Sequence, residues 1–126
     1  QYAVIEGVSF GILDGVNSIL KVNDNFEKIF MVGGGSRSSF WIELLASLLN
    51  RNLSVCDQSE YGAALGVARL AMHSDKSIQN NNIIKEITTS KDYFPSSNKS
   101  DILMKRYQIW KDLYSTNKKI ASNLIS

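Results

Sequence analysis

Apolar positions in the first part of the chain switch between helical and strand-like spacing. They recur at helical spacing from about Tyr2 to Val22, and again over Phe40–Leu49, where they fall at i, i+1, i+4, i+5, i+8 and i+9. Two short apolar runs between polar turns, Lys28–Val32 and Leu53–Cys56, are typical of buried strands. A third helix is predicted over about Glu60–Met72, and its many small residues predict close packing against neighbouring elements.

The remainder of the chain is more polar. Segment 74–99 contains an asparagine run and the only proline, Pro95, which predicts a long connection with one short helix near Asn82–Thr88. A last helix, about Asp101–Ile120, is amphipathic. One of its faces is aromatic and aliphatic, and its lysines lie opposite: the apolar face comprises Leu103, Tyr107, Trp110 and Tyr114. We therefore expect an α/β core in 1–73, a polar connection in 74–99 and a C-terminal helix in 100–126.

The order of these elements predicts an α/β fold with helices packed on a short parallel sheet, because alternating strands and helices form right-handed crossovers. Two short strands are too few for an independent sheet, and parallel sheets need cover on both faces. Either further strands or a second chain must supply that cover. Since the sequence begins with Gln1 in the middle of a helical pattern, we interpret it as a piece of a longer protein.

Composition and charge exclude several classes of function. A net charge of +2 offers no strong field for nucleic acid or a membrane surface, and the apolar runs fall short of the roughly 20 residues that span a bilayer. With one cysteine, Cys56, no disulfide within the chain can form, which indicates a reducing, cytoplasmic compartment. One histidine, His73, and one cysteine cannot build a His/Cys zinc cluster, so no metal site is expected.

The most informative segment is the glycine turn, Gly33–Ser39, which reads Gly-Gly-Gly-Ser-Arg-Ser-Ser between a strand and a helix. Either Ser38 or Ser39 is expected to cap the helix. A turn without side chains brings backbone N–H groups and a helix N-terminus close to a phosphate or nucleotide.

Three interpretations of this turn remain after the P-loop is excluded for lack of its lysine. The first is a main-chain site for a phosphate or nucleotide. The second is a dinucleotide-binding oxidoreductase, since Gly33 and Gly35 fit two of the three fingerprint glycines, Ser38 takes the third place and Asp57 follows the next strand. The third is a non-catalytic interaction module that uses the glycine stripe of the first helix (Gly7, Gly11, Gly15) and the aromatic face of the last.

The segment Val32–Trp41 resembles the glycine turn of the FGGY carbohydrate kinases, and among them the xylulose kinases, although Ser36 stands where that family more often has alanine. Segment Glu60–Ala68 is similar to the next helix of the family, and Phe94-Pro95 with Leu113-Tyr114 is similar to its C-terminal tail.

This resemblance implies an actin-like, ribonuclease-H-like ATPase fold of two domains. The chain would be the later part of the C-terminal, nucleotide-binding domain, with its initial antiparallel strands missing. The implied reaction transfers the γ-phosphate of ATP to a pentulose, D-xylulose, with Mg²⁺ held mainly by ATP. The sugar site and the catalytic aspartate would lie in the other domain, so this chain alone would be inactive. The sequence does not decide whether the protein forms a homo-oligomer. The residues implied to contact ATP are Gly33, Gly34, Gly35, Ser36 and Ser39.

Overall fold

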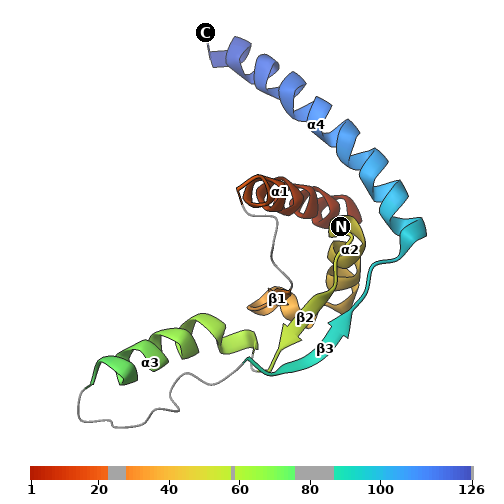
Figure 1. The fold of residues 1–126 in the computed structure, drawn as a ribbon. Coiled ribbons are helices and arrows are strands. Elements are labelled where there is room, and N and C mark those ends of the chain that lie inside the picture. Colours follow the sequence, from red (N-terminus) through yellow and green to blue (C-terminus); the bar gives the residue numbers. More distant parts are fainter. Residues whose placement is uncertain (23–27, 58, 76–86, 126) are drawn as a thin grey trace.

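The structure is a computed structural model that describes residues 1–22, 28–57, 59–75 and 87–125. The described residues form four helices and one small sheet, and Figure 1 shows how they are arranged. Two short 3-10 turns, here called η1 and η2, precede α2 and α3. In chain order the elements are α1 (Tyr2–Leu20), β1 (Ile29–Met31), η1 (Gly34–Arg37), α2 (Ser39–Leu49), β2 (Leu53–Cys56), η2 (Ser59–Tyr61), α3 (Gly62–Ser74), β3 (Thr89–Tyr93) and α4 (Ser97–Ile125).

The sheet has the strand order β1-β2-β3. Strands β1 and β2 are parallel, with Ile29 opposite Leu53, as the alternation of strands and helices predicts. Strand β3 runs antiparallel to β2, with Tyr93 opposite Leu53. The predicted parallel pair is confirmed, and a third strand that the sequence did not predict adds an antiparallel edge, so the sheet is mixed.

Strand β3 lies inside segment 74–99, which the sequence analysis treated as a connection. Its sequence Thr-Ser-Lys-Asp-Tyr lacks an apolar alternation, because only Tyr93 is buried and the other four side chains face solvent. Pairing with β2, reinforced by a 2.6 Å hydrogen bond from Ser54 Oγ to Asp92 Oδ1, makes it a strand. The short helix expected near Asn82–Thr88 falls mostly outside the described residues, and Ile87 and Thr88 are not helical.

Helix α2 is the centre of the described fold, which explains why its sequence is apolar on most sides. One face, with Ile42 and Leu45, packs on the sheet against residues that include Leu53, Val55 and Tyr93. The other face packs against α1 and α4 in a second cluster: Phe10, Leu13, Leu44, Leu48, Leu103 and Tyr107. The start of α4 is also tied to α2, since Ser96 N–H donates to Ser47 Oγ at 3.2 Å.

Helix α1 is long and apolar enough to cross a membrane by length and composition, with a mean hydropathy of 1.4, although no single run in it is that long. One such helix is weak evidence for a membrane span, and a small part of α1 is buried in the described structure. Phe10 and Leu13 are buried against α2 and α4, and Glu6 pairs with Arg106 at 2.8 Å.

Among the described residues, no other backbone lies close to the glycines of α1. A Cβ at Gly7 would lie 3.9 Å from Trp110 Nε1, and a Cβ at Gly11 or Gly15 would meet no atom of the described residues within 4 Å.

Helix α3 extends away from the sheet, as Figure 1 shows. None of its described residues is buried, and Val67 and Leu70 are 67% and 68% exposed. The prediction that this small-residue helix is closely packed is wrong for the described residues. Helix α4 likewise extends beyond the body in Figure 1, so that Leu113 and Tyr114 are exposed while Tyr107 is buried.

Candidate nucleotide site

The glycine turn begins where β1 ends, and its first residue requires glycine. Gly33 has φ = 83°, a backbone conformation that residues with a Cβ rarely adopt. The N–H of Gly33 donates to Ser59 O at 2.7 Å, which joins the turn to the start of η2. The chain then forms one 3-10 turn, η1, before entering α2.

The second and third glycines differ in their surroundings. A Cβ at Gly35 would lie 2.5 Å from Trp41 Cζ3, a distance that real Cβ atoms do not show, so the indole ring excludes any side chain there. The indole itself is held by a 2.9 Å hydrogen bond from Trp41 Nε1 to Ser9 Oγ of α1. At Gly34, in contrast, a Cβ would meet no described atom within 4 Å. Gly33 and Gly35 are therefore explained by the fold of the turn, and Gly34 is not.

Helix α2 begins directly after the turn. Ser38 is the N-cap: its hydroxyl accepts from Trp41 N–H at 3.3 Å, which decides between the two serines that the sequence proposed. Ser39 is the first helical residue and is exposed, so it is available to a ligand at the positive end of the helix dipole.

Ser36 is buried within the turn, with 8% of its surface exposed. Its hydroxyl lies 2.7 Å from Gly33 O and 2.6 Å from Ser59 Oγ, which is also buried. Sequence reasoning did not single out Ser59, because nothing in the sequence links it to a turn 23 residues earlier.

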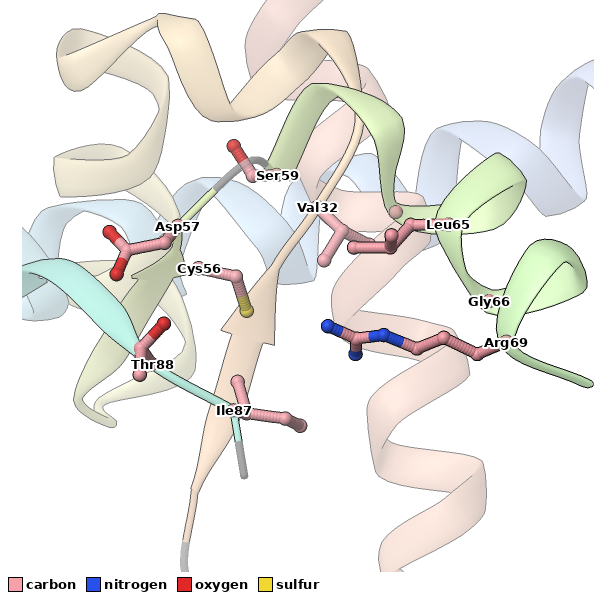
Figure 2. A pocket seen from close by; sticks show the side chains of 10 residues that line it. Val32, Cys56, Asp57, Ser59, Leu65, Gly66, Arg69, Ile87 and Thr88 are labelled. Atoms are coloured by element: carbon pink, nitrogen blue, oxygen red, sulfur yellow. The ribbon is translucent and has the colours of Figure 1, made fainter. Parts of the chain in front are cut away.

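A cavity of about 680 Å³ opens beside the turn, between α3, the carboxyl ends of β1 and β2 and the amino end of β3 (Figure 2). Val32, Ser59 and Gly62 line it where it adjoins the turn. Figure 2 shows the guanidinium of Arg69 reaching from α3 towards the side of the cavity formed by Cys56 and Ile87. The lining thus combines one cation and one carboxylate, Asp57, with hydroxyl and apolar groups. Sequence reasoning did not select Arg69, although it is the only Asp, Glu, Lys or Arg in α3.

Cys56 lines the same cavity, and its thiol is not activated. Burial raises the pKa of Cys56 above its usual value, and the neighbouring Asp57 carboxylate raises it further. Since the thiolate is the nucleophile, less of the reactive form is present near neutral pH. Arg69 is the cation of this cavity, yet the net effect on the thiol is upward.

This predicts slow alkylation of Cys56. In the full-length protein at pH 8, iodoacetamide should modify Cys56 more slowly than it modifies a free cysteine peptide, as followed by peptide mass spectrometry. The rate should climb as pH rises through the raised pKa, and Asp57→Asn should increase the rate at pH 8 by removing a like charge. Modification faster than that of the peptide would contradict a raised pKa for the Cys56 thiol.

Within the described ranges, no group of three His, Cys, Asp or Glu side chains lies close enough to hold a metal ion. The turn also carries no carboxylate. Its donor set, backbone N–H groups and hydroxyls, suits an anion and not a bare cation.

Residues 1–74 match the C-terminal domain of the FGGY family of carbohydrate kinases. The chain therefore belongs to this family, and its α/β fold is that of the actin-like ATPase domain of FGGY sugar kinases.

Similar proteins include two curated xylulose kinases. That of Escherichia coli (strain K12) is 26% identical over 115 residues, 89% of this chain and 23% of the relative. That of Haemophilus influenzae is 36% identical over 70 residues, 56% of this chain and 14% of the relative. This chain thus spans at most about a quarter of the length of these relatives.

Solved structures agree with this family. A crystal structure of a xyloylose kinase from Brucella ovis matches with a TM-score of 0.77 and 28% identity, over 94% of this chain and 24% of that one. A ligand-bound xylulose kinase from Lactobacillus acidophilus matches with a TM-score of 0.68 and 25% identity, over 90% of this chain and 23% of that one. Membership of a kinase family decides against the dinucleotide-binding oxidoreductase.

Proposed function

We propose that this chain is the nucleotide-binding part of an ATP-dependent sugar kinase that phosphorylates a ketopentose, D-xylulose. The glycine turn receives ATP, with contacts from Gly33, Gly34, Gly35, Ser36 and Ser39. The general base and the sugar site belong to the remainder of the protein, so the 126-residue chain by itself is inactive. Xylulose kinases among the relatives and structural neighbours support the choice of sugar.

The open position at Gly34 carries this proposal. Gly33 has a backbone reason to be glycine and Gly35 a packing reason, yet a side chain at Gly34 would meet nothing among the described residues. An exposed position with no internal need for glycine, at the start of a turn whose first N–H groups lack intrahelical acceptors, suits close approach by a ligand. The N-terminus of α2 adds a positive field that favours phosphate.

In this mechanism the protein contributes mainly position and charge stabilisation. The turn holds the nucleotide by its main chain, so that the γ-phosphoryl group points towards the sugar hydroxyl presented by the other domain. Mg²⁺ would be held mainly by the phosphates of ATP, where it would neutralise their charge. Closure of the two domains excludes water and limits hydrolysis of ATP.

The remaining parts of the proposal follow from this activity. The substrate partners are ATP and a pentulose, and neither nucleic acid nor a membrane has a role. A kinase of sugar metabolism with a free thiol belongs in the cytoplasm. Light scattering on the full-length protein tests for a homo-oligomer.

The decisive experiment is a kinase assay on the full-length protein. ADP release should require D-xylulose, ATP and Mg²⁺, and kcat/KM should be higher for D-xylulose than for D-ribulose, glycerol or gluconate. A preference for gluconate or glycerol would overturn the sugar and keep the kinase. Absence of ADP release with every sugar, together with binding of a nicotinamide dinucleotide, would overturn the proposal.

A further inference from the structure

The hydrogen bonds between the glycine turn and η2 form a closed circuit. Ser36 has one hydroxyl proton, and its Oγ lies 2.7 Å from the carbonyl oxygen of Gly33, to which it donates. The 2.6 Å contact between Ser36 Oγ and Ser59 Oγ must then use the proton of Ser59. The circuit closes through the backbone, since Gly33 N–H donates to Ser59 O at 2.7 Å.

This circuit is shielded from water and holds Gly33 and Ser36 in position. Ser36 and Ser59 are 8% and 7% exposed, so neither hydroxyl can readily exchange its partner for solvent. Gly33, whose positive φ starts the turn, accepts two hydrogen bonds at its carbonyl, from Ser36 Oγ at 2.7 Å and Ser36 N–H at 3.1 Å, and donates one from its amide. The shape of Gly33–Ser36 therefore depends on Ser59, a residue that follows strand β2 in the chain.

We propose that Ser59 is a positioning residue, which acts through the Ser36 hydroxyl to hold the main chain of Gly33–Ser36 in the shape that receives ATP. This rests on the proposed nucleotide role of the turn. While the circuit is closed, the Ser36 proton is committed to Gly33, so Ser36 contributes to ATP binding through its backbone. Alanine at either position has no hydroxyl and cannot form the circuit, so the circuit depends on a hydroxyl at both positions of this chain.

The test uses the full-length protein and compares Ser36→Ala, Ser59→Ala and the double variant. Each single variant should raise KM for ATP about fivefold, the effect of losing one ordinary hydrogen bond, with kcat and KM for the sugar unchanged. The double variant should be no worse than the poorer single variant, because both break the same circuit. Ser59→Thr, which keeps the hydroxyl, should stay within about twofold of the parent.

Ser47→Ala is the matched control. Ser47 is also a buried serine, 1% exposed, with hydrogen bonds to Glu43 O and from Ser96 N–H, but it lies in the helical core and not at the turn. It should lower stability and leave KM for ATP unchanged. If Ser47→Ala raised KM for ATP as much as Ser59→Ala does, or if Ser59→Ala left it unchanged, the positioning role would be refuted.

Hydrogen exchange separates failure of this inference from failure of the nucleotide assignment. Without any nucleotide, Ser59→Ala should speed exchange of the amides in 33–38 about fivefold relative to the parent protein. Unchanged exchange there would refute the circuit whatever the enzyme does. If instead exchange rises as expected but ATP affinity is insensitive to Ser59→Ala and to Gly34→Val alike, the nucleotide assignment fails and the positioning role falls with it.

Discussion

Replacing Gly34 with valine in the full-length protein will abolish ATP binding and leave the fold intact. A Cβ at Gly34 meets no described atom within 4 Å, and it is Gly33, not Gly34, that has the positive φ. The substitution should therefore change stability by no more than about 0.5 kcal/mol. The isopropyl group would occupy the space where the nucleotide lies against the main chain. Even a displacement of the reacting groups by about 1 Å lowers the reaction rate about 100-fold.

Isothermal titration with ATP and a thermal unfolding curve measure the two halves of this prediction. Gly34→Ala is the graded control, since a single methyl should weaken binding less than valine does while the unfolding midpoint again stays near that of the parent protein. An unchanged KM for ATP in Gly34→Val would show that the nucleotide binds away from the turn.

Replacing Gly35 with valine will have the opposite profile, a large loss of stability. Its Cβ would lie 2.5 Å from Trp41 Cζ3 and 3.1 Å from Trp41 Cε3. The indole cannot move aside freely, because its Nε1 donates to Ser9 Oγ at 2.9 Å. Overpacking of this kind costs about 1–3 kcal/mol, and the branched side chain places valine at the upper end. Urea unfolding of the full-length protein should show a lowered midpoint.

Trp41→Leu supplies the control for this mechanism. It removes the ring that meets the new side chain, so Gly35→Val should cost markedly less in the Trp41→Leu background than in the parent protein. Strictly additive losses in the double variant would contradict the steric explanation and leave the third glycine of the turn unexplained.

Local pattern was sufficient for the elements whose apolar residues have one clear period. The predicted strand Leu53–Cys56 is confirmed, and the predicted helix Phe40–Leu49 differs from α2 only by the inclusion of Ser39. The predictions for these two segments are confirmed because residue propensity, helix capping and burial favour the same structure there. The family was also evident from the glycine turn, since the residues of such a turn are constrained by backbone geometry and appear directly in the sequence.

Elements that depend on distant partners were missed or misjudged. Strand β3 is polar, and its identity as a strand comes from pairing with β2, which no local pattern records. Helix α3 was expected to pack closely from its small residues, yet none of its described residues is buried. Small side chains permit close approach, but a partner must be present before they are covered.

For the candidate site, the sequence by itself determined the glycine turn and a serine cap at the start of α2, because positive φ and helix capping are properties of residue type and order. The structure was needed to choose Ser38 over Ser39 as that cap. Only the tertiary structure decided what each residue of the turn does. It placed the indole of Trp41 over Gly35, left Gly34 open and brought Ser59 against Ser36. These roles depend on distances between segments far apart in the chain, and such distances are set by how helices and strands pack.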